Sequence, residues 1–436
     1  MRNPEVAEAT VRTPWGPAAE LRERKLHPSS GMSRAEVARN QRERLFGAVV
    51  AVVSNKGYEA CTVADIVELS GVSRSAFYEH FSNKDECITA AAEEMIELAI
   101  VELDQLDENG LPPGPETILE RFIALVCAEP AAARVCFVEL HAAGRRGEEI
   151  ADRGSESLAR IVAEANSRQS MGEQMKPAMI EMLTGGLGKL VQSRISSGRE
   201  EELSDLAPGL WAWFKSVEPP PRPLGSPRRQ RPGPGPGFEG YTPSERIARA
   251  VARVMSKKGY RAMSTDDIAA QAAISLSTFY ANFADKRDAV LAALEMSGAQ
   301  IMALAGPAAR RAGDWQQGVR ALYEAMFSYF VAEPEMARLA TIGVYEAGPQ
   351  ALARRDRVIN SLTEMLAPGF EENPGASEVS TEAAAATVYA LMRKEVRARG
   401  PESLGSVVPL ATYITLVGFI GPERATAVAN GDRPRS

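Results

Sequence analysis

Histidine and cysteine are scarce in this sequence of 436 residues, which contains 3 histidines and 4 cysteines. No two cysteines are spaced as CxxC, and so few cannot build a disulfide scaffold across a chain of this length. A Cys/His zinc site has few ligands to draw on either. We therefore expect no metal and no cofactor, and we expect the protein to work in the reducing cytoplasm.

The sequence also lacks an excess of positive charge and a long apolar run. Its formal net charge is −7, which argues against a protein that coats nucleic acid through bulk positive charge and leaves room only for a local basic patch. Its longest apolar run, residues 410–420, is far shorter than the roughly 20 residues that a membrane-spanning helix needs. We expect this run to form a buried helix and the protein to have no membrane partner.

A proline-rich segment divides the chain into two similar halves. Residues 217–240 contain 8 prolines and 5 glycines in 24 positions, so they are predicted to form a linker rather than a helix or a paired strand. The first 33 residues, with Pro and charge throughout, are predicted to be a disordered tail. The halves repeat each other at an offset of 202, because residues 56–91 and 258–293 are identical at 14 of 36 positions without a gap.

Both halves show the periodicity of helices. Leu45, Val49, Val52 and Val53 recur at i, i+4, i+7 and i+8, the apolar stripe of a helix that faces a core, and equivalent residues recur in the second half. No stretch alternates with a period of two residues between hairpin turns. The fold class is therefore predicted to be all-α.

Each half then contains two short helices joined by a tight turn. Thr62 and Ser264 are suitable N-caps for the first of these helices, and Ser73 and Ser275 are suitable N-caps for the second. Two short helices with such a turn form a helix-turn-helix, whose second helix enters the major groove of DNA. Each half is thus predicted to carry one DNA-reading unit.

Two segments carry the helix cap, the turn, the FY..F pattern and a following Lys at the same spacing: GYEACTVADIVELSGVSRSAFYEHFSNKDE and GYRAMSTDDIAAQAAISLSTFYANFADKRD. They resemble the DNA-binding domain of the tetracycline-repressor (TetR) family of transcription regulators. The resemblance implies a three-helix reader in each half, followed by a larger helical domain for ligand binding and dimerisation. The expected parts are the tail 1–33, the readers 34–92 and 241–294, the regulatory domains 93–216 and 295–436, and the linker 217–240.

The residues expected to contact DNA are the helix caps, the outward side chains of the recognition helices and the lysine after them. In the first reader they are Thr62, Ser73, Arg74, Ser75, Tyr78, His80 and Lys84. In the second reader they are Ser264, Ser275, Ser277, Tyr280, Asn282 and Lys286.

The chain departs from the family pattern in two ways. The family usually has one reader per chain and acts as a two-fold dimer, whereas this chain has two readers. The second reader has Ala273 at the place of a turn glycine, and Leu276 and Asn282 replace Arg74 and His80. Because arginine is the commonest bidentate reader of guanine, the second reader is expected either to read a different sequence or to bind weakly.

An effector pocket is harder to place from the sequence. The candidate residues lie at near-helical spacing and are Phe137 and His141 in the first half and Tyr323, Phe327 and Tyr345 in the second. An apolar pocket between helices is what the resemblance implies. The same aromatic pattern is also typical of a plain helical core.

These observations predict a DNA-binding transcriptional regulator, a repressor that a small-molecule effector releases from its operator. The two halves are expected to pair as an intramolecular pseudo-dimer, or else two chains form a homodimer. The alternative is a ligand-sensing or protein-interaction module in which one or both readers no longer bind DNA. An enzyme is not expected, because the sequence shows no Ser-His-Asp or Cys-His spacing and no nucleotide loop.

Overall fold

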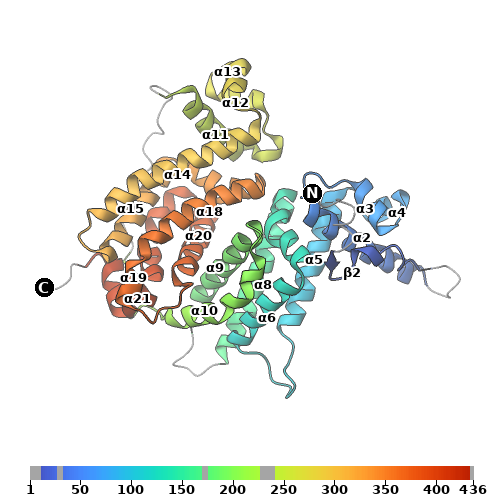
Figure 1. The fold of residues 1–436 in the computed structure, drawn as a ribbon, viewed down its shortest axis with the longest axis horizontal. Helices are drawn as coiled ribbons and strands as arrows, with labels where there is room; N and C mark the ends of the chain where they lie inside the picture. Colours follow the sequence, from blue (N-terminus) through green and yellow to red (C-terminus); the bar gives the residue numbers. More distant parts are fainter. Residues whose placement is uncertain (1–10, 27–32, 169–174, 226–240, 433–436) are drawn as a thin grey trace. The chain divides into compact units, whose positions relative to one another are not determined.

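The computed structural model of the protein describes residues 11–26, 33–168, 175–225 and 241–432. The chain divides into two units: unit 1 contains Met1–Gln169 and Arg194–Ser204, and unit 2 contains Ser170–Ser193 and Asp205–Ser436. Apart from one pair of two-residue strands, the regular secondary structure of the described residues is helical, so the all-α prediction is confirmed (Figure 1).

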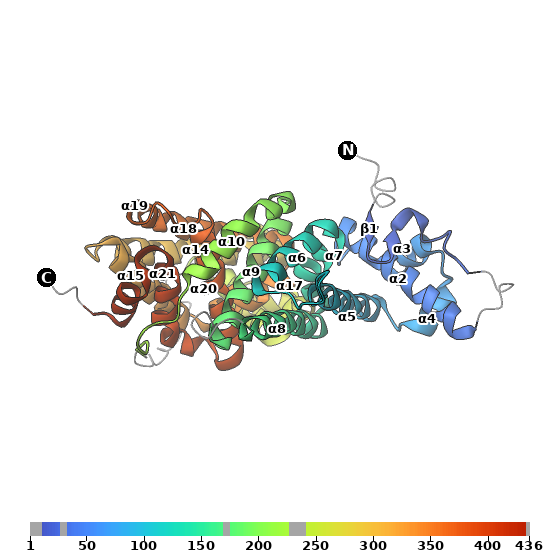
Figure 2. The ribbon, with the colours of Figure 1, turned by 90° about the horizontal axis from the view of Figure 1, so that it is seen from below.

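Unit 1 starts with a small hairpin and continues with helices. Figure 2 shows α2, α3 and α4 grouped at one end of the unit. Its elements are β1 (Arg12–Thr13), β2 (Gly16–Pro17), η1 (Ala18–Glu20), α2 (Arg34–Lys56), α3 (Val63–Ser70), α4 (Arg74–His80), α5 (Lys84–Leu103), α6 (Pro115–Ala128), α7 (Pro130–Arg134), the π-helical turn η3 (Val135–Glu139), η4 (Leu140–Ala143), α8 (Arg145–Ser167) and η5 (Glu200–Glu202).

Unit 2 combines the helices of the second half with most of two helices from the first half, α9 (Pro177–Ser196) and α10 (Leu203–Ser216). Its other elements are α11 (Pro243–Ala262), α12 (Thr265–Ala272), α13 (Leu276–Asn282), α14 (Lys286–Arg310), α15 (Trp315–Ala332), α16 (Pro334–Arg338), the π-helical turn η6 (Leu339–Gly343), α17 (Val344–Glu346), α18 (Pro349–Thr363), η7 (Glu364–Leu366), α19 (Pro368–Glu372), α20 (Ser380–Arg399), η8 (Pro401–Val407) and α21 (Val408–Asn430).

Capping boxes set the start of the first two helices of both readers. In α2 and α11 the boxes are formed by Ser33 with Glu36 and by Thr242 with Glu245. In α3 and α12 they are formed by Thr62 with Asp65 and by Ser264 with Asp267. Each box satisfies two backbone N–H groups that a helix start otherwise leaves without a partner.

The N-terminal segment differs from the disordered tail expected for residues 1–33. Residues 11–26 form the hairpin and η1, and Trp15 and Leu21 are buried in the core of unit 1. The Trp15 ring lies 5.1 Å from the ring of Phe46 on α2. Apolar burial therefore outweighs the Pro-rich and charged composition here. The rest of the expected tail lies outside the described residues, apart from Ser33.

In unit 2, α9 and α10 pack directly on helices of the second half, as Figures 1 and 2 both show. A Cβ atom on Gly186 of α9 would lie 2.0 Å from Thr387 Oγ1 of α20. The Ser377 hydroxyl donates a hydrogen bond of 2.8 Å to the Gly209 carbonyl of α10. Only a glycine allows the backbones of α9 and α20 to come so close.

The beginning of the expected linker also lies on unit 2. The Tyr413 hydroxyl donates a 2.6 Å hydrogen bond to the carbonyl of Glu218, and Asn430 of α21 bonds to Pro223 and Gly225. Residues 217–225 are thus held along α21, whereas residues 226–240 lie outside the described part.

In the part of the chain that the structure describes, two helical segments, Lys286–Arg310 and Pro401–Asn430, are long and apolar enough to cross a membrane. They are half and nearly three-quarters buried over their apolar windows. Tyr413 and Leu416 of α21 are fully buried, as expected for residues 410–420. Burial of this kind is typical of the core helices of a water-soluble domain.

Candidate nucleic-acid interface and effector cavity

The first reader is built by α2, α3 and α4. Thr62 caps α3, Gly71 ends it in the left-handed region with φ of 62°, and Ser73 caps α4. Phe77 is fully buried and Phe81 nearly so, which anchors α4 to the core of unit 1. The opposite face of α4 is left for solvent or a ligand.

The exposed face of α4 carries most of the side chains predicted to contact DNA. Ser73, Arg74 and Ser75 are exposed, and Tyr78 keeps 49% of its surface although both neighbours in the FY..F pattern are buried. The Arg74 guanidinium lies 6.0 Å from the centre of the Tyr78 ring. A cation beside an exposed phenol can supply donors to phosphates and to base edges.

His80 lies at the edge of this face and is half-buried. Its Nε2 atom is 3.1 Å from Oε1 of Gln41 on α2. Burial and the nearby Arg42 hold the pKa of His80 below its usual range, so the ring is neutral at pH 7. A neutral ring that contacts α2 offers DNA a hydrogen bond but no charge.

Lys84 and Lys286 have a structural role that the sequence did not reveal. The ammonium of Lys84 donates to the carbonyls of Tyr58 and Cys61 at 2.9 and 2.8 Å. Lys286 bonds to Tyr260 and Met263 in the same way, at 3.0 Å each. Each lysine thus fastens the start of the fourth helix to the loop before the second, and its contact with phosphate stays a prediction.

The second reader repeats this geometry with two differences. Tyr280 is 56% exposed and Ser264, Ser275 and Ser277 are exposed as in the first reader. Ala273 takes the place of Gly71 at φ of 53°, the one described non-glycine residue with positive φ. Asn282 is exposed, but its amide donates to the Thr278 carbonyl and accepts from Ser244, at 2.8 Å each. Reading adenine would require Asn282 to exchange these partners.

An arginine supports the turn in both readers, buried in the first and half-buried in the second, and sequence reasoning missed it. Arg44 donates to the carbonyls of Leu21 and Ser70 at 2.9 and 3.0 Å through Nε. Arg246 donates to the Ala272 carbonyl at 2.6 Å. The two arginines and the two accepting residues are each 202 positions apart, so extending the repeat upstream of residue 56 would have found them.

A glutamate links each helical domain to its reader. Oε2 of Glu139, at the end of η3, accepts the backbone N–H of Tyr58 at 3.0 Å. Oε2 of Glu346 on α17 accepts the N–H of Tyr260 at 2.7 Å. Both N–H groups follow the glycine that bends the chain after the first reader helix, at Gly57 and Gly259. The same contact therefore occurs once in each unit.

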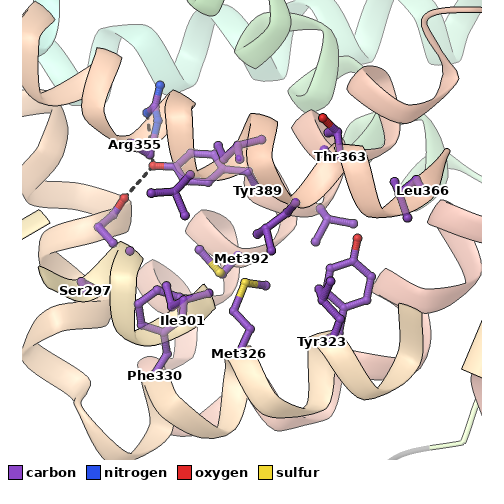
Figure 3. Close-up of a pocket in the computed structure, with 18 of the residues that line it drawn as sticks. Ser297, Ile301, Tyr323, Met326, Phe330, Arg355, Thr363, Leu366, Tyr389 and Met392 are labelled. Carbon is purple, nitrogen blue, oxygen red and sulfur yellow. Dashed lines mark hydrogen bonds between the residues drawn. The ribbon is translucent and has the colours of Figure 1, made fainter. Parts of the chain in front are cut away.

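A cavity lies inside unit 2, between α14, α15, α18 and α20 (Figure 3). Its volume is about 840 Å³, counting the part that is open to solvent. Most lining side chains are apolar, with Met326 and Met392 in the middle of the view and Arg355 and Tyr389 at one end. A mostly apolar lining with a few polar side chains is typical of a small-molecule site.

Arg355 belongs both to this cavity and to a buried polar cluster. It donates to Asp356 at 2.8 Å, to the Tyr389 hydroxyl at 3.2 Å and to Gln192 of α9 at 2.8 Å. Lys189 of α9 lies 2.9 Å from the same Asp356 carboxylate. Burial and the charge of Arg355 lower the pKa of Lys189 to about 8. The cluster thus joins the cavity to a helix from the first half of the chain.

The aromatic residues predicted to line a pocket are partly brought together. Tyr323 lines the cavity, and its hydroxyl lies 2.8 Å from Thr415 Oγ1. Phe327 is fully buried against the Tyr323 ring, and Tyr345 stacks on Arg355 at 5.1 Å from the guanidinium carbon. Phe137 and His141 lie in unit 1, where Phe137 contacts the Phe122 ring and His141 is buried. Among the described residues, no three His, Cys, Asp or Glu side chains gather as a metal site.

A comparison with protein families matches both readers. The family model described as "Bacterial regulatory proteins, tetR family" matches residues 47–91 and again residues 247–293. These ranges contain the two helix-turn-helix units. The tandem arrangement predicted from the sequence is thereby confirmed.

Individual relatives match only parts of the chain. YerO of Bacillus subtilis (strain 168), an uncharacterized HTH-type transcriptional regulator, is 26% identical over 83 residues, which are 19% of this chain and 29% of that protein. YvdT of the same organism, also an uncharacterized HTH-type transcriptional regulator, is 35% identical over 54 residues, or 12% and 28%. The chain thus spans less than a third of the length of these relatives. The solved structure of PfmR, a TetR family transcriptional regulator from Thermus thermophilus, aligns with a TM-score of 0.34 and 24% identity over 40% of this chain and 96% of that one.

Proposed function

We propose that this chain, which carries two DNA-binding domains of the TetR family, is a cytoplasmic transcriptional regulator that reads two DNA half-sites as a covalent pseudo-dimer. It acts as a repressor, and a small molecule in the cavity of unit 2 releases it from DNA. The protein is a binding protein rather than an enzyme. The observation that carries the pseudo-dimer is the packing of α9 and α10 on the second half.

That packing has the features of a subunit interface. Gly186 permits contact with Thr387, Lys189 and Gln192 reach Asp356 and Arg355, and Glu181 pairs with Lys394 at 2.5 Å. Helices that are separated by more than 150 residues in the sequence thus share one core. In a two-chain regulator such an interface would join two polypeptides, whereas here one polypeptide supplies both sides. Two readers on one chain suit half-sites about one helical turn, roughly 34–36 Å, apart.

Ligand response is supported by contacts that run from the cavity to the second reader. Arg355 lines the cavity and stacks on Tyr345. The next residue, Glu346, accepts the N–H of Tyr260 at the base of α12. A ligand that moves Arg355 would move α17 and the reader with it, and it shifts the populations of the two states only by its differential affinity for them.

The function is tested by selecting bound fragments from random duplex DNA and counting chains per complex by light scattering. One chain on a two-part site with unlike halves is the expected result. The Arg74→Ala variant should lose about 1–3 kcal/mol of binding free energy and relax specificity in one half-site only. Leu276→Ala, at the matching position of the second reader, is the control and should leave the specificity in the half-site read by Arg74 unchanged.

Three outcomes would overturn parts of the proposal. Two chains on a palindrome would refute the covalent pseudo-dimer and favour a homodimer. No selected sequence, from a folded protein at low salt, would favour the ligand-sensing module instead. Affinity that does not fall as salt rises would contradict phosphate contacts altogether.

A further inference from the structure

The cavity of unit 2 is elongated and mostly apolar, and its charged lining residue, Arg355, lies at one end. Six lining residues, from Arg355 to Leu366, lie on one face of α18 and η7, and this wall spans about 16 Å at 1.5 Å per residue. Only five of the 20 lining side chains are polar, and Arg355 is the only charged one. A ligand that fills such a space must be apolar along most of its length.

The remaining polar side chains of the wall are engaged within the protein. The Tyr323 hydroxyl pairs with Thr415, and the Tyr389 hydroxyl donates to the Ala340 carbonyl at 2.9 Å. Figure 3 shows Tyr323 and Arg355 at opposite ends of the cavity. The chemistry of the ligand is therefore decided at the Arg355 end.

Two buried cations lie at that end. Lys189 and Arg355 share the single carboxylate of Asp356, and all three side chains are buried. Glu382 also acts on Lys189, but more weakly than Asp356. The Arg355 guanidinium has five N–H donors, and its three hydrogen bonds go to Asp356, Tyr389 and Gln192. An anion bound beside it would therefore gain a charge-assisted hydrogen bond.

We propose that the cavity binds an elongated apolar monocarboxylate, with its chain between α15 and α18 and its carboxylate at the Arg355 guanidinium. The role of this molecule as an effector rests on the proposed function, whereas its binding does not. An apolar cation is disfavoured, because none of the described residues that line the cavity carries a carboxylate. A neutral apolar molecule would fill the chain region but make no charge-assisted hydrogen bond with Arg355.

The test uses the full-length protein without DNA and isothermal titration with palmitate below its aggregation limit. Hexadecanol, which has the same chain without the charge, is the matched probe. Palmitate should bind at least tenfold more tightly than hexadecanol, because a charge-assisted hydrogen bond is about twice as strong as a neutral one. The Arg355→Met variant should remove that difference between the two probes.

A second variant tests the proposal even if the Arg355→Met variant does not fold. Ala385→Phe fills the cavity from α20 and should weaken palmitate binding at least tenfold, whereas Leu304→Phe, on the exposed face of α14, should not. The proposal is overturned if palmitate does not bind, if both probes bind equally, or if Ala385→Phe has no effect. If the protein binds palmitate but no DNA, this inference is supported and the proposed function is refuted. If it binds DNA but no palmitate, only this inference is refuted.

Discussion

The turn between the two short helices offers a direct test, because the two readers differ by one methyl group at its left-handed residue, Gly71 or Ala273. Ala273 has φ of 53° and ψ of 52°, where Gly71 of the first reader has φ of 62°. An L-residue in this region costs about 1–2 kcal/mol. Glycine regains that energy but loses about 0.5–1 kcal/mol because its unfolded chain is more flexible. Ala273→Gly should therefore stabilise the second reader by about 0.5–1 kcal/mol.

The reverse change in the first reader should cost more than the backbone terms alone. A Cβ on Gly71 would lie 2.8 Å from Cγ of Arg22 and 3.1 Å from Nη2 of Arg44. Arg44 is buried and holds the Ser70 carbonyl, so it has little room to move. Overpacking adds about 1–3 kcal/mol. Gly71→Ala should thus destabilise the first reader by about 1.5–4 kcal/mol.

Global unfolding would blur these effects, since a chain of two units need not unfold in one step. Hydrogen exchange read by mass spectrometry on peptides from α3–α4 and α12–α13 gives the local opening free energies separately. In each variant the unchanged reader serves as the internal control. Slower exchange of α3–α4 in Gly71→Ala, or faster exchange of α12–α13 in Ala273→Gly, would refute the reasoning.

Two further predictions concern the contact between α9 and the second half. Gly186→Ala would stabilise an isolated helix by about 1 kcal/mol, but its Cβ would clash with Thr387 at an overpacking cost of about 1–3 kcal/mol. Unit 2 should therefore lose up to about 2 kcal/mol in urea unfolding. Gly405→Ala, whose Cβ would meet nothing within 4 Å, is the control. The free energy of unfolding should rise with pH between about 8, the pKa of Lys189 in the folded state, and 10.5, its pKa in the unfolded state. In this range Lys189 is protonated in the unfolded state but has lost its proton in the folded state. Lys189→Met should show a smaller rise than the wild type between pH 8 and 10, and equal slopes would contradict the lowered pKa.

The readers could be predicted from the sequence because their signals are local. Thr62 with Asp65, Ser73, and the glycine of the turn all act within a few residues of one another. Lys84 was assigned only to DNA, since its bonds to carbonyls 23 and 26 residues earlier leave no local pattern. Arg44 could have been found, because Arg246 repeats it at the same offset.

The packing of α9 on the second half and the cavity of unit 2 could not be predicted from the sequence. Gln192 and Arg355 are 163 residues apart, and Glu181 and Lys394 are 213 apart, so no periodicity connects them. Gly186 looks like an ordinary helix-weakening glycine until Thr387 is placed against it. Trp15 and Leu21 were hidden in the same way, because two apolar side chains in a charged segment form no stripe.

Because both readers lie on one chain, a substitution in one reader leaves the sequence of the other unchanged, and this leads to a last prediction. In a homodimer one substitution changes the readers of both half-sites, so the operator stays palindromic. In this chain Leu276 and Asn282 of the second reader occupy the positions that correspond to Arg74 and His80 of the first. All four side chains lie on recognition helices of the same length and with the same N-cap. The double variant Leu276→Arg with Asn282→His should therefore bind a palindrome of the half-site read by α4 more tightly than the wild type does. Competition binding between that palindrome and the wild-type operator measures the change. An unchanged preference would mean that the second reader does not touch DNA, because a reader in the groove must respond to an arginine placed at its N-terminus.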